Sequence, residues 1–131
     1  MKIFHYLNFL FIFLVLVAIC IAEDVVVSNS LKEVQSYCFQ LEQTLSVNDD
    51  LKNMDIVLQV DNLESKWLKQ ESNLCYLVNH KNIQEMGQEI SKLKSYIPSN
   101  DVDAFKVSVG LIKSYCKSYT HFMGANLHNI L

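Results

Sequence analysis

The sequence contains no arginine, and its acidic residues outnumber its lysines by 14 to 11. Without Arg, it lacks the planar donor group that grips phosphate or carboxylate at two points. It also lacks a basic stripe that would release counterions from nucleic acid. We therefore expect no nucleic-acid binding.

Glycine and proline are also scarce, with three glycines and one proline, Pro98, in 131 residues. A chain so poor in turn residues is unsuited to many short strands and favours long helices. The phosphate-binding glycine loop, the G-x-S-x-G elbow, H-E-x-x-H and Glu-x-x-His are all missing from the sequence. We therefore predict no enzyme activity, and we assign no catalytic, cofactor-binding or metal-binding residue.

A long apolar run is present at the N-terminus. Residues 3–22 are almost wholly apolar, with Lys2 before them and Glu23 and Asp24 after them. This pattern is typical of an export signal whose N-terminus stays in the cytoplasm. Residues 9–22 contain no polar side chain except the thiol of Cys20. The run therefore lies between the apolar core of a cleaved signal, roughly 7–15 residues, and a spanning helix of about 20 residues.

Two fates of this segment remain open, because residues 20–22 (Cys-Ile-Ala) form an acceptable cleavage site. We expect residues 1–23 to be a signal anchor or a signal peptide, and residues 24–131 to form one extracytoplasmic domain. The chain would then cross the cell membrane once through residues 3–22, or be secreted if it is cut. Lipidation at Cys20 is disfavoured because Ile19 occupies the place of a small residue.

Four amphipathic segments follow at helical spacing. Ser30 and Glu33 match a capping box that would start the first helix. The second segment runs from Leu51 to Asn79, after a polar stretch that would hold its cap. The apolar stripes of these two are Leu31, Val34, Cys38, Leu41 and Leu45, then Ile56, Val60, Leu63, Trp67, Leu74 and Leu77 or Val78.

The third segment is predicted to begin near Asn82, and Pro98 would stop it. Residues 100–103 place carboxylates at the start of the fourth segment. The stripes are Ile83, Met86, Ile90, Leu93 and Ile97, then Val102, Phe105, Val109, Ile112, Cys116, Tyr119 and Phe122 or Met123. The prediction is an all-α fold, an N-terminal transmembrane or signal helix followed by an antiparallel four-helix bundle of two helical hairpins.

Two Cys-x₄-His pairs, Cys75 with His80 and Cys116 with His121, suggest a metal site at first sight. Residues five apart on a helix are separated by about 140° of rotation, so they point to different faces. We therefore expect no metal, and we place His80 at the C-terminal end of the second helix. Cys38, Cys75 and Cys116 are predicted to be buried, or to form one disulfide with three possible pairings.

The other conspicuous polar and small residues have structural interpretations. Glu85 and Glu89 are predicted to lie on a solvated face, and Gly87 and Gly110 to allow close helix packing. Trp67 is predicted to anchor the core, with an interface role as the alternative. The tail, with Leu127, Ile130 and Leu131, would fold back on the bundle or dock on a partner.

Several of these features together resemble a known family. They are the apolar N-terminus, "SKWLKQESNLCYLVNH", "IQEMGQEISKLKSYIPSNDVDAF" and the final "NIL". The chain resembles a bacterial domain-of-unknown-function family of short, membrane-anchored helical proteins, found mainly in Gram-positive anaerobes. It departs from the family in having Cys75 and Cys116. The resemblance implies location and fold, and it assigns no activity or site.

The function expected from these observations is that of a non-enzymatic, membrane-tethered interaction or structural module outside the cytoplasm, with a protein partner. The alternative is a carrier of a small apolar ligand or lipid, held in a cavity between the helices.

Overall fold

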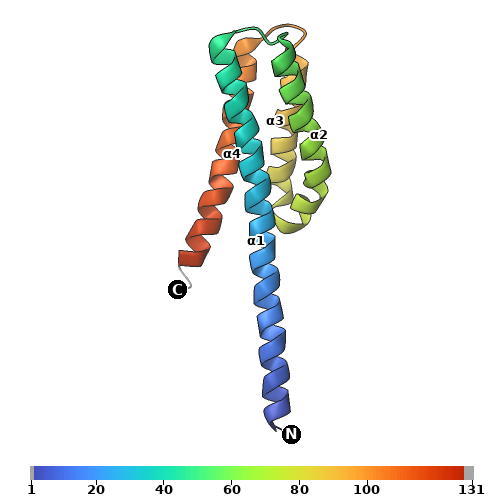
Figure 1. The fold of residues 1–131 in the computed structure, drawn as a ribbon, viewed down its shortest axis with the longest axis vertical. Helices are drawn as coiled ribbons and strands as arrows, with labels where there is room; N and C mark the ends of the chain where they lie inside the picture. Colours follow the sequence, from blue (N-terminus) through green and yellow to red (C-terminus); the bar gives the residue numbers. More distant parts are fainter. Residues whose placement is uncertain (1, 129–131) are drawn as a thin grey trace.

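The computed structural model describes residues 2–128, with side chains from residue 3 to residue 120. This part of the chain contains four helices and no strand: α1 (Lys2–Val47), α2 (Met54–Leu77), α3 (His80–Tyr96) and α4 (Val102–His128). Each helix packs against two neighbours, in the closed order α1, α2, α3, α4 (Figure 1). The all-α fold, an antiparallel four-helix bundle of two hairpins, is confirmed.

Helix α1 runs without a break from the apolar N-terminal segment into the bundle (Figure 1). Its 46 residues correspond to a length of about 69 Å. Residues 3–26 are exposed, and Val27 is the first buried residue. Among the described helices it is the one long and apolar enough to cross a membrane, and a signal sequence would share these features.

The predicted capping box is wrong, because Ser30 and Glu33 lie inside α1. No Gly or Pro occurs between Glu23 and Ser30, so the helix continues and its amides already have carbonyl partners one turn earlier. The Ser30 side chain is buried. The Glu33 carboxylate instead accepts hydrogen bonds from Lys66 and Gln70 of α2.

The predicted stripes form the core. Trp67 and Phe105 are its largest fully buried side chains, and the partly buried members of the stripes pack around it. Val27 and Leu51 extend the core beyond the prediction. The predicted members that are buried are Leu31, Val34, Cys38, Leu41, Leu45, Ile56, Val60, Leu63, Trp67, Leu74, Ile83, Met86, Ile90, Leu93, Phe105, Val109, Ile112 and Cys116.

Two helix starts differ from the prediction. Helix α2 begins at Met54, where the side chain of Asn53 accepts a hydrogen bond from the Asp55 amide. Helix α3 begins at His80, where Asn79 caps in the same way, so the predicted start near Asn82 is two residues late. An Asn side chain is well suited to accept a hydrogen bond from a free amide in the first turn of a helix. Several Asn residues lie near these two helix starts, so the sequence pattern alone does not select one.

The far end of the bundle consists of the α1–α2 loop, residues 48–53, and the α3–α4 turn, residues 97–101, at the top of Figure 1. The Leu51 amide donates to the Asn100 side chain at 2.8 Å and ties the two connections together. Asn100 has a φ of 53°, a left-handed conformation that Asn tolerates. The predicted start of α4 is confirmed, and the Asp101 carboxylate accepts from the Ala104 amide.

The near end of the bundle is formed by the α2–α3 turn, residues 78–79, which lies beside the middle of α1, and by the end of α4, which reaches farther toward the N-terminus of α1 (Figure 1). The predictions for His121, Phe122, Met123 and the tail concern side chains outside those that the structure describes.

Candidate functional site

Three adjoining hollows lie along the outer side of α2 and α3. Their volumes are about 650, 500 and 440 Å³. Leu68 lines all three hollows and is 63% exposed, so it is the apolar side chain that the hollows share. We call this surface the α2–α3 groove. It is lined by Asp61, Glu64, Ser65, Trp67, Leu68, Lys69, Glu71, Ser72, Cys75, Tyr76, His80, Gln84, Gly87, Gln88, Ser91, Lys92, Lys94 and Ser95.

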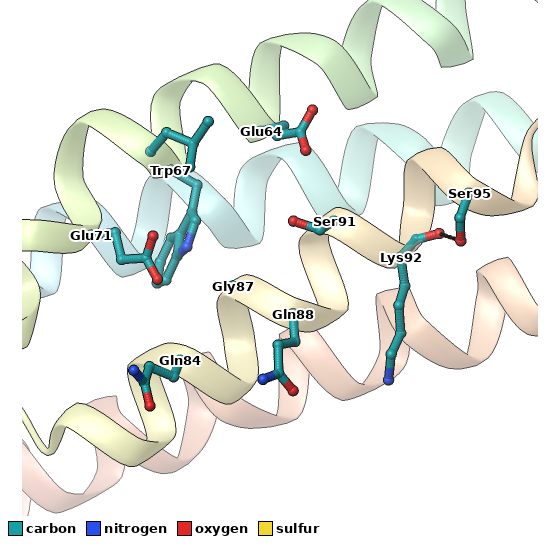
Figure 2. A pocket seen from close by; sticks show the side chains of 10 residues that line it. Glu64, Trp67, Glu71, Gln84, Gly87, Gln88, Ser91, Lys92 and Ser95 are labelled. Carbon is teal, nitrogen blue, oxygen red and sulfur yellow. Dashed lines mark hydrogen bonds between the residues drawn. The ribbon is translucent and has the colours of Figure 1, made fainter.

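Trp67 and Gly87 set the helix separation in the largest hollow (Figure 2). A Cβ atom added to Gly87 would lie 2.8 Å from Trp67 Nε1 and 3.0 Å from Glu71 Oε1. The predictions of close helix packing at Gly87 and of Trp67 as a core anchor are therefore confirmed. The indole is 2% exposed, and its Nε1 atom has no hydrogen-bond partner among the described residues.

Gly110, in contrast, has open space around it, with no heavy atom within 4 Å of an added Cβ. The predicted close packing at this residue is wrong, because Gly110 lies on the exposed side of α4.

The charged groups of the groove are partly paired across the two helices. Lys94 of α3 contacts Asp61 at 2.8 Å and Glu64 at 3.4 Å, both on α2. Hydrogen bonding to Asp61 and then to Glu64 raises the pKa of Lys94. This end of the groove is therefore a partly exposed charge cluster in which one lysine contacts two carboxylates, and its exposed apolar element is Leu68.

A second polar cluster lies between α3 and α4. Glu89 is buried, and its carboxylate accepts hydrogen bonds from Ser108 Oγ at 2.9 Å and from Lys92 Nζ at 2.5 Å. Burial acts to raise the pKa of Glu89, but the hydrogen bonds from Lys92 and Ser108 outweigh it and hold that pKa below its ordinary value. One turn away, the Tyr115 hydroxyl donates to Glu85 at 3.2 Å.

The prediction that both carboxylates lie on a solvated face is therefore wrong for Glu89, whereas the Glu85 side chain is 38% exposed. Glu89 is three residues after Met86 and four before Leu93, so helical spacing places it beside the core. That spacing was the signal available in the sequence. The partner Ser108 could not be found in the same way, because the pairing depends on how α4 is aligned against α3.

The three cysteines of the bundle differ in their surroundings. Cys38 and Cys116 are fully buried on the neighbouring helices α1 and α4, as predicted, whereas Cys75 is half-buried in the groove. Burial, followed by the nearby Cys116 thiol, raises the pKa of Cys38 to about 12. Burial also raises the pKa of Cys116 to about 12. All of these cysteines are free thiols.

The predicted reason for excluding a Cys75–His80 pair, that both residues lie on one helix and point to different faces, is wrong. Helix α2 ends at Leu77, so the two residues are not on one helix, and both line the same hollow of about 440 Å³. His80 is the first residue of α3 rather than the last of α2. Within the described residues, no group of three or more His, Cys, Asp or Glu side chains is arranged to hold a metal ion.

The described residues of the groove form an open surface in which the ionisable groups nearest the core already have partners. The carboxylate nearest the core is already engaged by Lys92 and Ser108, and the most deeply buried thiols carry a raised pKa. The groove presents a leucine flanked by amide, hydroxyl and charged side chains. This composition resembles a small apolar anchor point with a polar rim.

Comparison with known families gives one match. Residues 25–130 match the family described as Domain of unknown function (DUF4363). No curated protein and no solved structure matches the chain.

Proposed function

The chain belongs to the DUF4363 family, whose description names no activity, and we propose that it is a non-enzymatic helical module tethered to the cell membrane. In this proposal the bundle lies outside the cytoplasm and binds a protein partner, or serves as a structural module, through the α2–α3 groove. The observation that carries the proposal is the exposed Leu68 at the centre of three adjoining hollows.

The membrane part of the proposal is supported by α1. Its apolar segment is preceded by Lys2, followed by Glu23 and Asp24, and continuous with the core helix. Such a segment would place the N-terminus in the cytoplasm and the bundle on the other side. Bacterial origin of the Gram-positive type belongs to the same proposal, and cleavage after the apolar segment would instead release a secreted bundle.

The topology is tested by protease treatment of intact cells from which the wall has been removed. We expect the bundle to be digested from outside while a short N-terminal fragment stays with the membrane. A bundle that is digested only after the membrane is lysed would contradict the proposed orientation.

Partner binding is tested by photo-crosslinking in cells from position 68. A photoreactive residue replaces Leu68 in one variant and Val107 of α4 in the control. Val107 is a matched control because it is 64% exposed, against 63% for Leu68, and α4 does not contact α2 in the described structure. We expect a discrete protein adduct from position 68 and none of the same mass from position 107.

A further variant distinguishes recognition from mere proximity. The photoreactive residue is placed at Ser65, an exposed position in the same groove, with and without Leu68→Glu. Loss of the adduct in the Leu68→Glu variant supports docking at Leu68. Identical adducts in both variants, or from position 107, overturn the proposed binding surface.

The lipid-carrier alternative has less support. A carrier needs enclosed apolar space, but the hollows of the described part are open and lined mainly by Glu, Gln, Ser and Lys. Organic extraction of the purified protein, followed by mass spectrometry, tests this alternative. A stoichiometric lipid in the extract would favour the carrier over the interaction module.

A further inference from the structure

The height of the α2–α3 turn above the apolar segment follows from the register of α1 and α2. Gln59 of α2 donates to Thr44 of α1 at 3.1 Å, and Gln70 donates to Glu33 at 3.0 Å. The two contacts are separated by the same number of residues on each helix, so the antiparallel register is constant between them. Continuing it from Gln70 to the end of α2 places Leu77 level with about residue 26 of α1.

This level lies close to the end of the apolar segment. Residue 26 is four residues past Ala22, a rise of about 6 Å along α1. The headgroup region adds roughly 5–8 Å to each side of a hydrocarbon core of about 30 Å. A tilt of about 20° would shift the turn by about 3 Å, because α2 lies about 9 Å from α1. If the hydrocarbon core of the bilayer ends at Ala22, its headgroup layer therefore reaches the α2–α3 turn.

The side chains at the turn suit that layer. Tyr76 is 89% exposed, Leu77 is exposed beside it, and Lys81 projects from the first turn of α3. Tyrosine is enriched where a membrane meets water, because its ring is apolar and its hydroxyl is polar. A lysine can lay its stem along the apolar region and keep its ammonium among phosphates.

The acidic residues of the bundle are distributed unevenly between its two ends, with fewer of them at the turn. Between Glu71 and Glu85 the chain has no acidic residue, and none follows Asp103 in α4. The far end, in contrast, carries Asp49, Asp50, Asp55, Asp101 and Asp103. The far end therefore carries the larger excess of negative charge, and an anionic surface would repel it more strongly than the near end.

The acidic groups close to the near end do not cancel this asymmetry. Lys81 contacts Glu85 at 3.9 Å, a long and exposed ion pair that leaves the ammonium available. Glu23 and Asp24 lie on α1 one and two residues past Ala22, within the same headgroup layer, so the contact depends on the apolar and amphipathic side chains of the turn rather than on a net positive charge.

We propose that residues 76–81 form a second membrane contact, in which the α2–α3 turn rests on the headgroup layer of the bilayer that α1 crosses. Tyr76 and Leu77 enter the headgroup layer, and Lys81 faces the lipid phosphates. This inference rests on the proposed membrane anchoring, since a cleaved chain would lack the membrane helix that holds the turn at the headgroup layer. It fixes the orientation of the bundle, places the hollow lined by Tyr76 and His80 at the membrane surface, and leaves the other two hollows beside Leu68 open to the side.

The test places a fluorescent probe at the turn in the full chain, reconstituted in vesicles of phosphatidylcholine and phosphatidylglycerol. A cysteine replaces His80, or Met54 in the control, after Cys20 and Cys75 are changed to Ser. Met54 is a matched control because it is 82% exposed and lies about 33 Å farther from the turn along α2. Lipids with a nitroxide on the headgroup then quench the probe.

We expect quenching at position 80 to be several-fold stronger than at position 54. The double change Tyr76→Ser with Leu77→Ser should lower quenching at position 80 toward the value at position 54. The double change Val47→Ser with Leu58→Ser, which removes exposed apolar side chains away from the turn, should leave it unaltered. Thermal melting confirms that each variant is folded.

The outcomes separate this inference from the anchoring on which it rests. Equal quenching at positions 80 and 54, in protein that floats with the vesicles, overturns the second contact and leaves the anchor intact. Protein that does not float with the vesicles overturns both. Quenching at position 80 that persists when both Tyr76 and Leu77 are Ser shows that these side chains do not make the contact and also contradicts the inference.

Discussion

Gly87 shows how one missing methyl group shapes the groove. The indole edge of Trp67 lies where a side chain at position 87 would begin, so α2 and α3 approach closely only because that side chain is absent. The ring cannot easily move away, since it is fully buried in the core. The width of the groove beside Leu68 thus depends on a residue that contributes no contact of its own.

Replacing Gly87 with Ala should therefore destabilise the bundle by about 1–3 kcal/mol, because the new methyl group forces the buried indole to shift. Gly110→Ala is the control, and it should stabilise by about 0.5–1 kcal/mol through the better helix propensity of Ala in open space. Chemical denaturation monitored by circular dichroism measures both. Equal effects of the two substitutions would contradict the close contact at Gly87.

The thiols of Cys38 and Cys116 should resist alkylation in the folded protein. With a pKa of about 12, only about one thiol in ten thousand is ionised at pH 8, and both side chains are fully buried. Cys75 is half-buried and should react at least about 100-fold faster than either. Mass spectrometry of a time course with iodoacetamide, with and without denaturant, gives the three rates; fast native-state labelling of Cys38 would contradict the packing of α1 on α4.

At the scale of the helix, the contact of α3 with α4 contains a buried carboxylate. Glu89 is held by Ser108 from the opposite helix and by Lys92 from its own helix, so its charge is neutralised within the interface. Replacing it with Gln keeps the shape but removes the charge that both partners stabilise. We expect Glu89→Gln to cost about 1–3 kcal/mol at neutral pH.

The same carboxylate should make stability depend on acid. Its folded pKa is below the ordinary value of 4.5, so as the pH falls the unfolded chain takes up the proton first. The contribution of Glu89 is therefore present above about pH 4.5 and is lost as the pH falls through the folded pKa. Urea unfolding from about pH 6 to pH 3 should show a smaller loss for Glu89→Gln than for the wild type. Parallel curves for the two proteins would contradict this role.

Helical spacing was sufficient to predict the number of helices and most of their buried faces. The stripes that include Trp67 and Phe105 follow from steps of three and four residues, which periodicity alone reveals. Helix ends were predicted less well, because Asn53, Asn79 and Asn82 are all chemically competent caps. Only packing decides which of them begins a helix.

The groove was not predictable from the sequence for a related reason. Leu68 follows Trp67 directly, so it falls outside the stripe, and nothing in the pattern says that hollows surround it. Ser30 and Glu33 matched a capping box because the pattern is local, whereas the decisive fact is that the preceding residues are also helical. Such errors occur where a short sequence pattern is chemically sound but the residues around it adopt a structure that leaves no place for it.

At the scale of the whole molecule, α1 is both the proposed membrane span and one wall of the bundle. An uninterrupted helix transmits position and rotation, whereas a flexible linker would let the bundle turn freely. The far end carries the acidic cluster and the near end carries Tyr76 and Lys81, so a fixed orientation gives these two ends different surroundings. The continuity of α1 is thus what makes the second membrane contact possible.

A flexible insertion tests this coupling directly. A Gly-Ser linker of about ten residues placed after Asp24 should leave the melting temperature of the bundle unchanged, because the core begins at Val27. It should also reduce quenching of a probe at position 80 toward that of a probe at position 54, since the turn is no longer held at headgroup height. An Ala-rich helical insertion of 7 residues, about two turns, is the control: it preserves rigidity but raises the turn by about 10 Å, and it should reduce quenching as well. If both insertions leave quenching at position 80 unaltered, the turn binds lipid by its own affinity and the rigid α1 is not what positions it.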